Sequence, residues 1–199
     1  DGSWSRGLGD VYKRQVEGNT REENSEFTAV GINTHTESLI ESINFYEKDL
    51  DISIANPSSD DNLKNSIDSL DKYDGMIWGG SSLNIYNDTD EIRRQISFMR
   101  ECQLKIKKIF AICWGLQVAV TVAGGQVKKS DKGAHRGIAH NIKVNSIGSN
   151  HKIYLDKKRQ FNSPAFNFDE VVKIPEGAIL LSSNELNNVM GLNFKTNKS

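Results

Sequence analysis

Cys113 is the residue of this sequence best placed to act as a nucleophile. It ends one apolar segment, residues 108–113 (KIFAIC), and a second apolar segment, residues 115–123 (GLQVAVTVA), follows almost at once. If these form a strand and then a helix, the thiol faces unpaired N–H groups and the positive end of the helix dipole, which favour the thiolate. Gly115 allows a tight turn there, and the Trp114 N–H would lie beside the attacked carbonyl. The alternative is a structural cysteine, since free cysteines are among the most buried residues.

A glycine-rich turn, Gly79-Gly80-Ser81-Ser82, follows another apolar segment, residues 75–78 (GMIW). In a parallel sheet, ligands bind beyond the carboxyl ends of the strands, where neighbouring loops face each other. Backbone N–H groups of such a turn can stabilise a developing oxyanion. An ordinary turn is the alternative. The second cysteine, Cys102, lies inside a polar helical segment, and we expect no chemical role for it.

Strand and helix patterns alternate over the first 125 residues. Thr34 and Glu37 fit a capping box at the start of a helix over residues 34–50, and Asp88 and Glu91 fit a second one. The remaining segments are a strand stub at 16–19, strands at 51–55, 75–78 and 109–113, and helices around 63–70 and at 115–123. After Gly124-Gly125, short strands are expected at 138–145, 151–155, 159–163, 170–174, 178–183 and 188–194. The pattern predicts an α/β fold with a doubly wound (flavodoxin-like), mostly parallel sheet flanked by helices and an added β-rich C-terminal part.

The composition is that of an ordinary globular domain and excludes several classes of partner. A formal net charge of -1 predicts no nucleic-acid partner. Without an apolar run of roughly 18 residues, we expect no membrane span. Two cysteines do not make a disulfide framework, which favours a reducing, cytoplasmic setting. No cluster of cysteines and histidines has ligand spacing, so neither a metal nor another cofactor is expected.

Four motifs in order resemble the class I (triad-type) glutamine amidotransferases over residues 73–194. AICWGLQ at 111–117 resembles the family's G-x-C-x-G-x-Q nucleophile motif, and YDGMIWGGSS at 73–82 resembles its strand and oxyanion loop. AGGQV with KGAHRGI, at 123–127 and 132–138, resembles the A-x-x-G-G-x-V and G-x-E-x-G segments. FNFDEVVKIPEGAILLSSN, at 166–184, resembles the S-H-x-D-x-V-x-x-L-P-x-G-x-x-x-L-A-x-S segment.

The resemblance implies a glutaminase mechanism with no cofactor. Cys113 would attack the side-chain amide carbonyl of glutamine, and the N–H groups of Trp114 and Gly80 would hold the oxyanion. Ammonia would leave for an acceptor, which a synthase subunit or domain would bind, and water would release glutamate. Substrate contacts are implied for the remaining matched residues, which are Gly79, Ser81, Gln117, Phe166, Asn167 and Phe168.

The sequence departs from the family pattern at several positions. Ala111 replaces a glycine, His135 replaces the glutamate of G-x-E-x-G, and Asn167 replaces the histidine of S-H-x-D. None of the three family residues is the general base, so these changes indicate a divergent subgroup. The base and its orienting acid come from an H-P-E motif that this sequence lacks. We therefore expect an incomplete domain that is inactive or nearly so.

Residues 1–15 have no hydrophobic period, and DVYKRQ at 10–15 resembles the translated end of a sequencing-library element. We expect residues 1–15 to be a non-native or disordered tail and residues 16–199 to form the amidotransferase-like domain. Three other functions stay open. The chain could hydrolyse other γ-glutamyl compounds through Cys113, or it could be a non-catalytic binding module. It could also belong to another cysteine-elbow family with an A-I-C-H-G turn, although Trp114 replaces that histidine.

Overall fold

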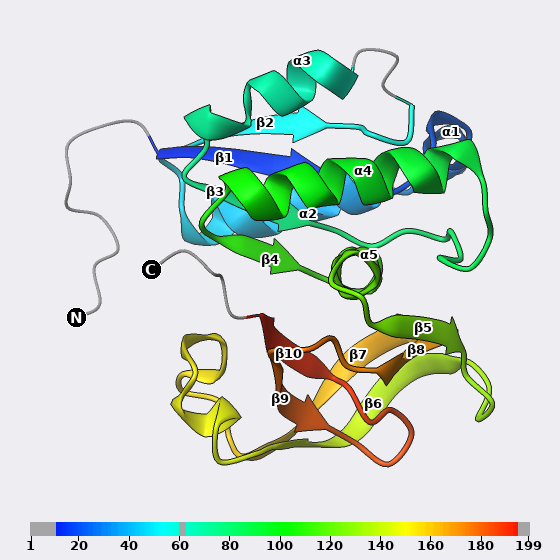
Figure 1. Ribbon diagram of the computed structural model, residues 1–199, viewed down its shortest axis with the longest axis vertical. Coiled ribbons are helices and arrows are strands. Elements are labelled where there is room, and N and C mark those ends of the chain that lie inside the picture. The colour runs from blue at the N-terminus through cyan, green and yellow to red at the C-terminus, as the bar shows by residue number, and fades with distance from the viewer. Residues whose placement is uncertain (1–10, 60–62, 195–199) are drawn as a thin grey trace. The chain divides into compact units, whose positions relative to one another are not determined.

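The computed structural model describes residues 11–59 and 63–194 of the chain (Figure 1). The chain divides into two compact units, one formed by residues 1–83 and 90–115 and the other by residues 84–89 and 116–199. Within them, the structure confirms the predicted α/β fold with a helix-flanked parallel sheet and an added β-rich part. The proposed tail falls partly outside the described residues, at residues 1–10.

The first unit is built on a four-stranded parallel sheet with the order β2-β1-β3-β4. Helix α4 covers one face of this sheet and α2 the other (Figure 1). The strands are β1 (Val11–Val16), β2 (Leu50–Ala55), β3 (Gly75–Trp78) and β4 (Ile109–Ala111). The helices are α1 (Arg21–Ala29), α2 (His35–Tyr46), α3 (Leu63–Asp68), a 3₁₀ turn (Leu70–Lys72) and α4 (Asp90–Lys105).

Local sequence signals explain where two of these helices begin. Thr34 caps α2 through a complete capping box, in which the Glu37 carboxylate accepts from the Thr34 N–H at 2.7 Å, as predicted. Thr20 and Glu23 form an equivalent box at the start of α1. β1 begins at Val11, whereas the sequence pattern indicated a strand stub at 16–19. That stub was placed too late because residues 1–15 were set aside as a tail, whereas residues 11–15 form most of β1.

The second unit is mainly antiparallel. One sheet has the order β10-β9-β6-β7, and β5 pairs with β8 in a second, two-stranded sheet. Its strands are β5 (Gln126–Lys129), β6 (His135–Val144), β7 (Gln160–Asn167), β8 (Asp169–Lys173), β9 (Ala178–Ser183) and β10 (Gly191–Phe194). Helix α5 (Trp114–Val122) precedes them. The strand predicted at 151–155 is wrong, since Gly148–Asn150 and Lys152–Tyr154 form 3₁₀ turns.

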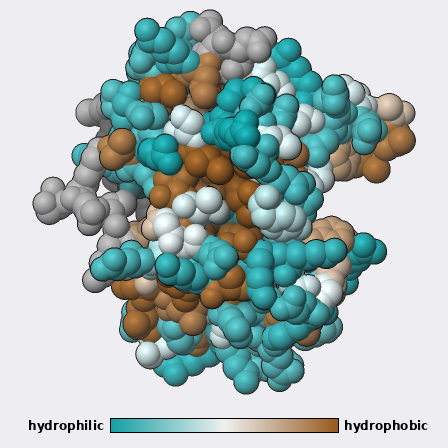
Figure 2. Space-filling view, turned by 45° about the vertical axis from the view of Figure 1, so that its right-hand side comes forward, coloured by the Kyte–Doolittle hydropathy of each residue, from teal (hydrophilic) through white to brown (hydrophobic). Residues whose placement is uncertain are grey.

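The cores are apolar, and most of the surface seen in Figure 2 is hydrophilic, with separate hydrophobic patches. Trp78, Phe98, Met99 and Trp114 are among the largest fully buried side chains of the first unit. Phe45 and Tyr46, at the end of α2, are 77% and 86% exposed. None of the helices in the described ranges has the length and apolarity needed to cross a membrane.

Candidate active site

The carboxyl ends of all four parallel strands lie in register. Val16 of β1 is the partner of Ala55 on one side and of Trp78 on the other, and Trp78 is the partner of Ala111. The loops that follow these residues therefore leave the sheet at one edge. In open parallel sheets that edge is where ligands bind. The loops after β3 and β4 contain the predicted oxyanion turn and the predicted nucleophile.

Cys113 has the backbone of a strand–helix elbow. Its φ is +52°, one of three positive values among the described non-glycine residues, and its thiol is exposed. A left-handed residue of this kind is strained, and such residues cluster at functional sites. β4 ends two residues earlier at Ala111, and α5 begins one residue later at Trp114. Ala111 itself is not among the positive-φ residues, which explains why alanine can replace the family's glycine there.

Hydrogen bonds join this elbow to the end of β3. The Ile112 N–H donates to the Trp78 carbonyl at 2.8 Å. The Gly115 N–H lies between two carbonyls, 3.0 Å from that of Ile112 and 3.1 Å from that of Gly79. A β-carbon built on Gly115 would lie 2.7 Å from the Trp78 oxygen, so only glycine fits at this position. The nucleophile loop therefore packs directly against the oxyanion loop.

The oxyanion loop is held from its other side by the segment after β1. The Gly79 N–H donates to the Val16 carbonyl at 3.4 Å, and the Ser82 N–H donates to Asn19 Oδ1 at 3.2 Å. Ser81 Oγ accepts from the Leu83 N–H at 3.1 Å, so this side chain stabilises the turn itself. A β-carbon built on Gly80 would lie 3.4 Å from His35 Nδ1, at the start of α2. The structure thus brings Cys113, Trp114 and the residues 79–82 together, as predicted from their positions at neighbouring strand ends.

Trp114 follows Cys113 directly and packs its ring into the core beside the elbow. Its side chain is 1% exposed, and its indole N–H donates to Gln95 Oε1 at 2.7 Å. The ring is therefore fixed in the core, so the predicted oxyanion role of Trp114 falls to its main-chain N–H. The other cysteine, Cys102, is fully buried in α4, and burial raises the pKa of its thiol. A protonated thiol without access to solvent fits the expectation that Cys102 has no chemical role.

The remaining predicted site residues belong to the second unit. Gln117 lies in α5, is 9% exposed, and its Oε1 has no hydrogen-bond partner among the described residues. Phe166 is 71% exposed, and Phe168 is half exposed beneath the Arg136 guanidinium, 5.0 Å from its ring centre. Asn167 donates from Nδ2 to the Asp169 carbonyl at 3.2 Å.

His135 and Asn167, the two departures from the family pattern, are direct partners in the β6–β7 ladder. Both line a small, open hollow with Ser130 and Glu170. His135 is 9% exposed, and its Nδ1 has no hydrogen-bond partner within the described part of the chain. Burial raises the pKa of the nearby Asp169 carboxyl, to which the Tyr86 hydroxyl donates at 3.2 Å. The two residues that replace the family's glutamate and histidine are therefore neighbours in the structure.

Two residues that hold the site were not found from the sequence. Gln95 is fully buried in α4, and Gly18 lies where the loop after β1 meets both the oxyanion loop and Trp114. A signal for Gln95 existed, because it stands three residues after Ile92 and four before Met99, on the apolar face of its helix. Across residues 11–59 and 63–194, no group of three or more histidine, cysteine, aspartate or glutamate residues could hold a metal ion.

The sequence of the chain is similar to those of several known proteins. The family model for class-I glutamine amidotransferases matches residues 15–199. The chain is 32% identical over 133 residues to the γ-glutamyl-L-1-hydroxyisopropylamide hydrolase of a Pseudomonas species, covering 65% of this chain and 45% of that protein. It is 26% identical over 120 residues to one subunit of the glutamine-hydrolysing GMP synthase of Sulfolobus acidocaldarius, covering 60% of each.

The fold is also that of a solved structure. A glutamine amidotransferase from Thermotoga maritima superposes with a TM-score of 0.69 at 14% identity, covering 94% of this chain and 73% of the other. The chain spans about half the length of the curated hydrolase that it matches.

Proposed function

Because the chain belongs to the class-I glutamine amidotransferase family, we propose that it cleaves the side-chain amide of glutamine with Cys113 as the nucleophile. The observation that carries the proposal is the Cys113 elbow, with its exposed thiol, its φ of +52° and its hydrogen-bonded link to Gly79 through Gly115. A buried structural cysteine would need none of these features. Cys102 supplies the contrast, since it is fully buried inside α4.

The proposed reaction is an acyl transfer in two steps. The Cys113 sulfur adds to the amide carbonyl, the carbon–nitrogen bond breaks, and nitrogen leaves as ammonia after taking a proton. Water then adds to the thioester, the carbon–sulfur bond breaks, and glutamate and the free thiol are released. In both steps the carbonyl oxygen becomes an oxyanion. We assign its stabilisation to the backbone N–H groups of Trp114 and Gly80, which belong to the two loops that Gly115 joins.

Substrate binding is assigned to the other matched residues. We propose that Gly79 and Ser81 shape the loop around the reacting amide. Gln117, whose buried Oε1 lacks a described partner, offers an acceptor for the substrate. Phe166, Asn167 and Phe168 would contact the amino-acid end of glutamine through their backbone, because the segment matches the family loop with that role.

Hydrolysis of another γ-glutamyl amide is the second candidate. It is favoured by the 32% identity to a γ-glutamyl-L-1-hydroxyisopropylamide hydrolase, against 26% for a GMP synthase subunit. The chemistry at Cys113 would be the same, and only the leaving amine would differ. In the amidotransferase case we propose that a synthase subunit or domain receives the ammonia, as the name of the GMP synthase relative indicates for that protein.

The proposal is tested by covalent labelling with a chloroketone analogue of glutamine. We expect one equivalent of label on Cys113, protection by glutamine, loss of labelling in Cys113→Ser and unchanged labelling in Cys102→Ser. Labelling that survives in Cys113→Ser would refute the assignment. Protection by a γ-glutamyl alkylamide at lower concentration than by glutamine would favour the second candidate.

A further inference from the structure

A buried hydrogen-bonded relay connects the elbow of Cys113 to the loop after β1. The Trp114 indole N–H donates to Gln95 Oε1 at 2.7 Å, and Gln95 Nε2 donates to the Gly18 carbonyl at 2.9 Å. Gln95 is fully buried and Trp114 nearly so. Both ends of the amide are therefore satisfied in one orientation, because the opposite one would place two donors together and two acceptors together.

Gly18 is where three segments meet. A β-carbon built on Gly18 would lie 2.6 Å from the Gly80 carbonyl oxygen, 2.8 Å from Trp114 Cδ1 and 3.1 Å from Ser81 Cβ. The backbone that Gln95 binds is therefore in contact with both loops that supply the proposed oxyanion donors. A displacement of Gly18 would move Gly80 and Trp114 relative to each other.

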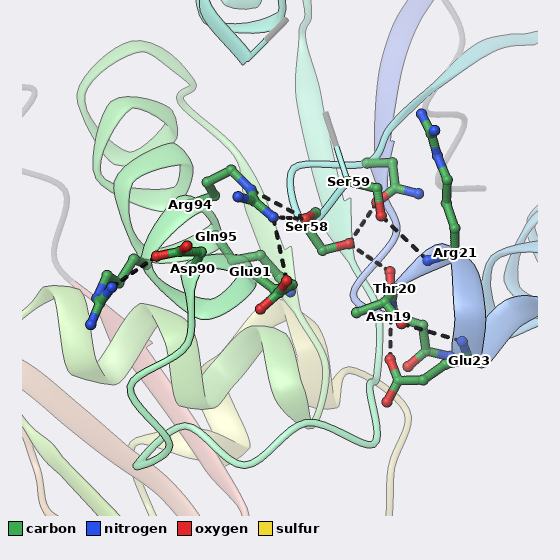
Figure 3. Close-up of polar contacts among 12 residues, drawn as sticks. Asn19, Thr20, Arg21, Glu23, Ser58, Ser59, Asp90, Glu91, Arg94 and Gln95 are labelled. Atoms are coloured by element: carbon green, nitrogen blue, oxygen red, sulfur yellow. Dashed lines mark hydrogen bonds and ion pairs between the residues drawn. The ribbon is translucent and has the colours of Figure 1, made fainter. Parts of the chain in front are cut away.

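A second set of hydrogen bonds fixes the same loop to the rest of the unit, and Figure 3 shows those that join Arg94, Ser58 and Asn19. The Asn19 N–H donates to Glu17 Oε1 at 2.8 Å, and Ser58 Oγ donates to the Asn19 carbonyl at 2.7 Å. The Ser58 carbonyl in turn accepts from the Arg94 guanidinium, one residue before Gln95. Ser82 Oγ donates to Glu23 at 2.6 Å. The loop after β1 is thus held by α4 on one side and holds the oxyanion loop on the other.

We propose that Gln95 is a positioning residue, which sets the distance between the Trp114 and Gly80 backbone N–H groups through Gly18 and the Trp114 ring. This inference rests on the proposed function of Cys113. Oxyanion donors act only when they lie about 2.7–3.1 Å from the developing charge. A shift of about 1 Å at a reacting centre can cost on the order of 100-fold in rate. Gln95 would act through its two neighbours without contacting the substrate.

Two cysteine reagents separate this role from a structural one. Addition of the Cys113 sulfur to the chloroketone analogue of glutamine forms an oxyanion before chloride leaves. Iodoacetamide reacts by direct displacement of iodide and forms no oxyanion. We expect Gln95→Leu to lower the rate constant for the chloroketone by roughly 10- to 100-fold and to change that for iodoacetamide by less than about threefold. Gln103→Leu, on the same helix, is the matched control and should leave both rate constants unchanged.

Trp114→Phe keeps an aromatic ring and removes the indole donor. We expect it to reproduce the effect of Gln95→Leu, and the double variant should react no more slowly than either single one, because both changes break the same relay. Cys102 reports on folding, since it is buried and becomes labelled by iodoacetamide only if the unit opens.

Equal losses of the rate constants for both reagents, or additive losses in the double variant, would overturn the role of Gln95. If the unmodified chain is not labelled at Cys113 by the chloroketone, the proposed function fails, and the positioning role fails with it.

Discussion

Single residues at the elbow carry the steric constraints on which the proposed chemistry depends. Cys113 has a left-handed backbone, and the residues on both sides of it are held in place. The Ile112 and Gly115 N–H groups bond to the end of β3 and the start of the oxyanion loop, and Gly115 has no room for a side chain. The strain at Cys113 is therefore maintained by packing on both sides of it.

Gly115→Ala should displace the elbow. Its β-carbon would lie 2.7 Å from the Trp78 oxygen and 2.9 Å from Trp78 Cβ, so one of the two segments must move. We expect a loss of about 1–3 kcal/mol in the free energy of unfolding, measured by urea denaturation, and a lower rate of Cys113 labelling by the chloroketone. Gly31→Ala is the control, because its β-carbon meets no atom within 4 Å and only its φ of +72° is unfavourable. If Cys113 of the Gly115→Ala chain were labelled as fast as in the parent, the elbow could accept a side chain at residue 115, contrary to this prediction.

The candidate residues differ in how far the sequence could predict them. Cys113 and the Gly79-Gly80 turn stand next to apolar segments, and their role follows from local pattern and the edge rule for parallel sheets. Gln95 and Gly18 are separated by 77 positions, and their contact depends on how α4 packs over the sheet. Such a contact arises from tertiary packing, so no local sequence pattern could predict it.

At the scale of elements, β1 is an unusual central strand. It is paired on both sides, yet Arg14 and Gln15 are 7% and 1% exposed. The Arg14 guanidinium donates to Ser53 and Ser69 and lies over the Tyr73 ring, while its buried Nε has no partner among the described residues. Gln15 is compensated only in part, since Nε2 donates to the Val16 carbonyl at 3.1 Å while its buried Oε1 has no described partner.

Gln15→Leu should stabilise the first unit. The side chain lies on a strand whose register partners at this position are Ile54 and Ile77, and the change removes a buried acceptor without a partner. Leaving such a group unsatisfied costs about 1–3 kcal/mol, so we expect a net gain of roughly 1 kcal/mol in urea denaturation. Gln126→Leu, at an exposed strand position, should change stability by less than about 0.5 kcal/mol. A destabilised Gln15→Leu chain would mean that the hydrogen bonds of the Gln15 amide contribute more to stability than the apolar packing of leucine.

The start of α2 depends on the Thr34–Glu37 box, and the dependence should vary with pH. Thr34→Ala should cost about 1 kcal/mol at neutral pH, because it removes the acceptor for the Glu37 N–H. Hydrogen bonds from the backbone and side chain of Thr34 lower the pKa of the Glu37 carboxyl. A lowered carboxyl pKa contributes stability above the unfolded-state pKa that is lost as pH falls through the folded one. The destabilisation by Thr34→Ala should therefore shrink between pH 7 and pH 3 in parallel urea titrations, and an unchanged difference would contradict the role of Glu37.

Strands and helices were predictable from the sequence where an apolar segment was bounded by clear turn residues. GMIW is a short apolar run next to a glycine pair, and β3 occupies those residues. β5 was missed because QVKK contains a single apolar residue. Residues 151–155 alternate like a strand, but His151 Nδ1 accepts from the Ile153 N–H at 3.3 Å and stabilises a 3₁₀ turn instead. Side-chain to backbone hydrogen bonds of this kind compete with the ladder and are invisible to periodicity.

At the scale of the molecule, the chain has the fold of its family but lacks the motif from which the family takes its general base. The parallel unit supplies the proposed nucleophile and oxyanion donors, which are enough for Cys113 to react with an electrophile such as the chloroketone. Turnover also needs a group that delivers a proton to the leaving nitrogen and activates water. The family takes these groups from an H-P-E motif, and the four histidines of this sequence, His35, His135, His140 and His151, lie outside any such motif.

We therefore predict that the 199-residue chain is labelled by the chloroketone but releases glutamate from glutamine very slowly. Loss of the base alone lowers the rate of triad hydrolases by roughly 10⁴-fold or more, while binding and the oxyanion donors persist. The measurement is glutamate release under saturating glutamine, with stoichiometric labelling of Cys113 as proof of a folded site. Rapid turnover would refute the prediction and require a different base. His35 would then be the first to test, because a β-carbon on Gly80 would lie 3.4 Å from its Nδ1. If His35 served as that base, His35→Ala would abolish turnover and leave iodoacetamide labelling of Cys113 intact.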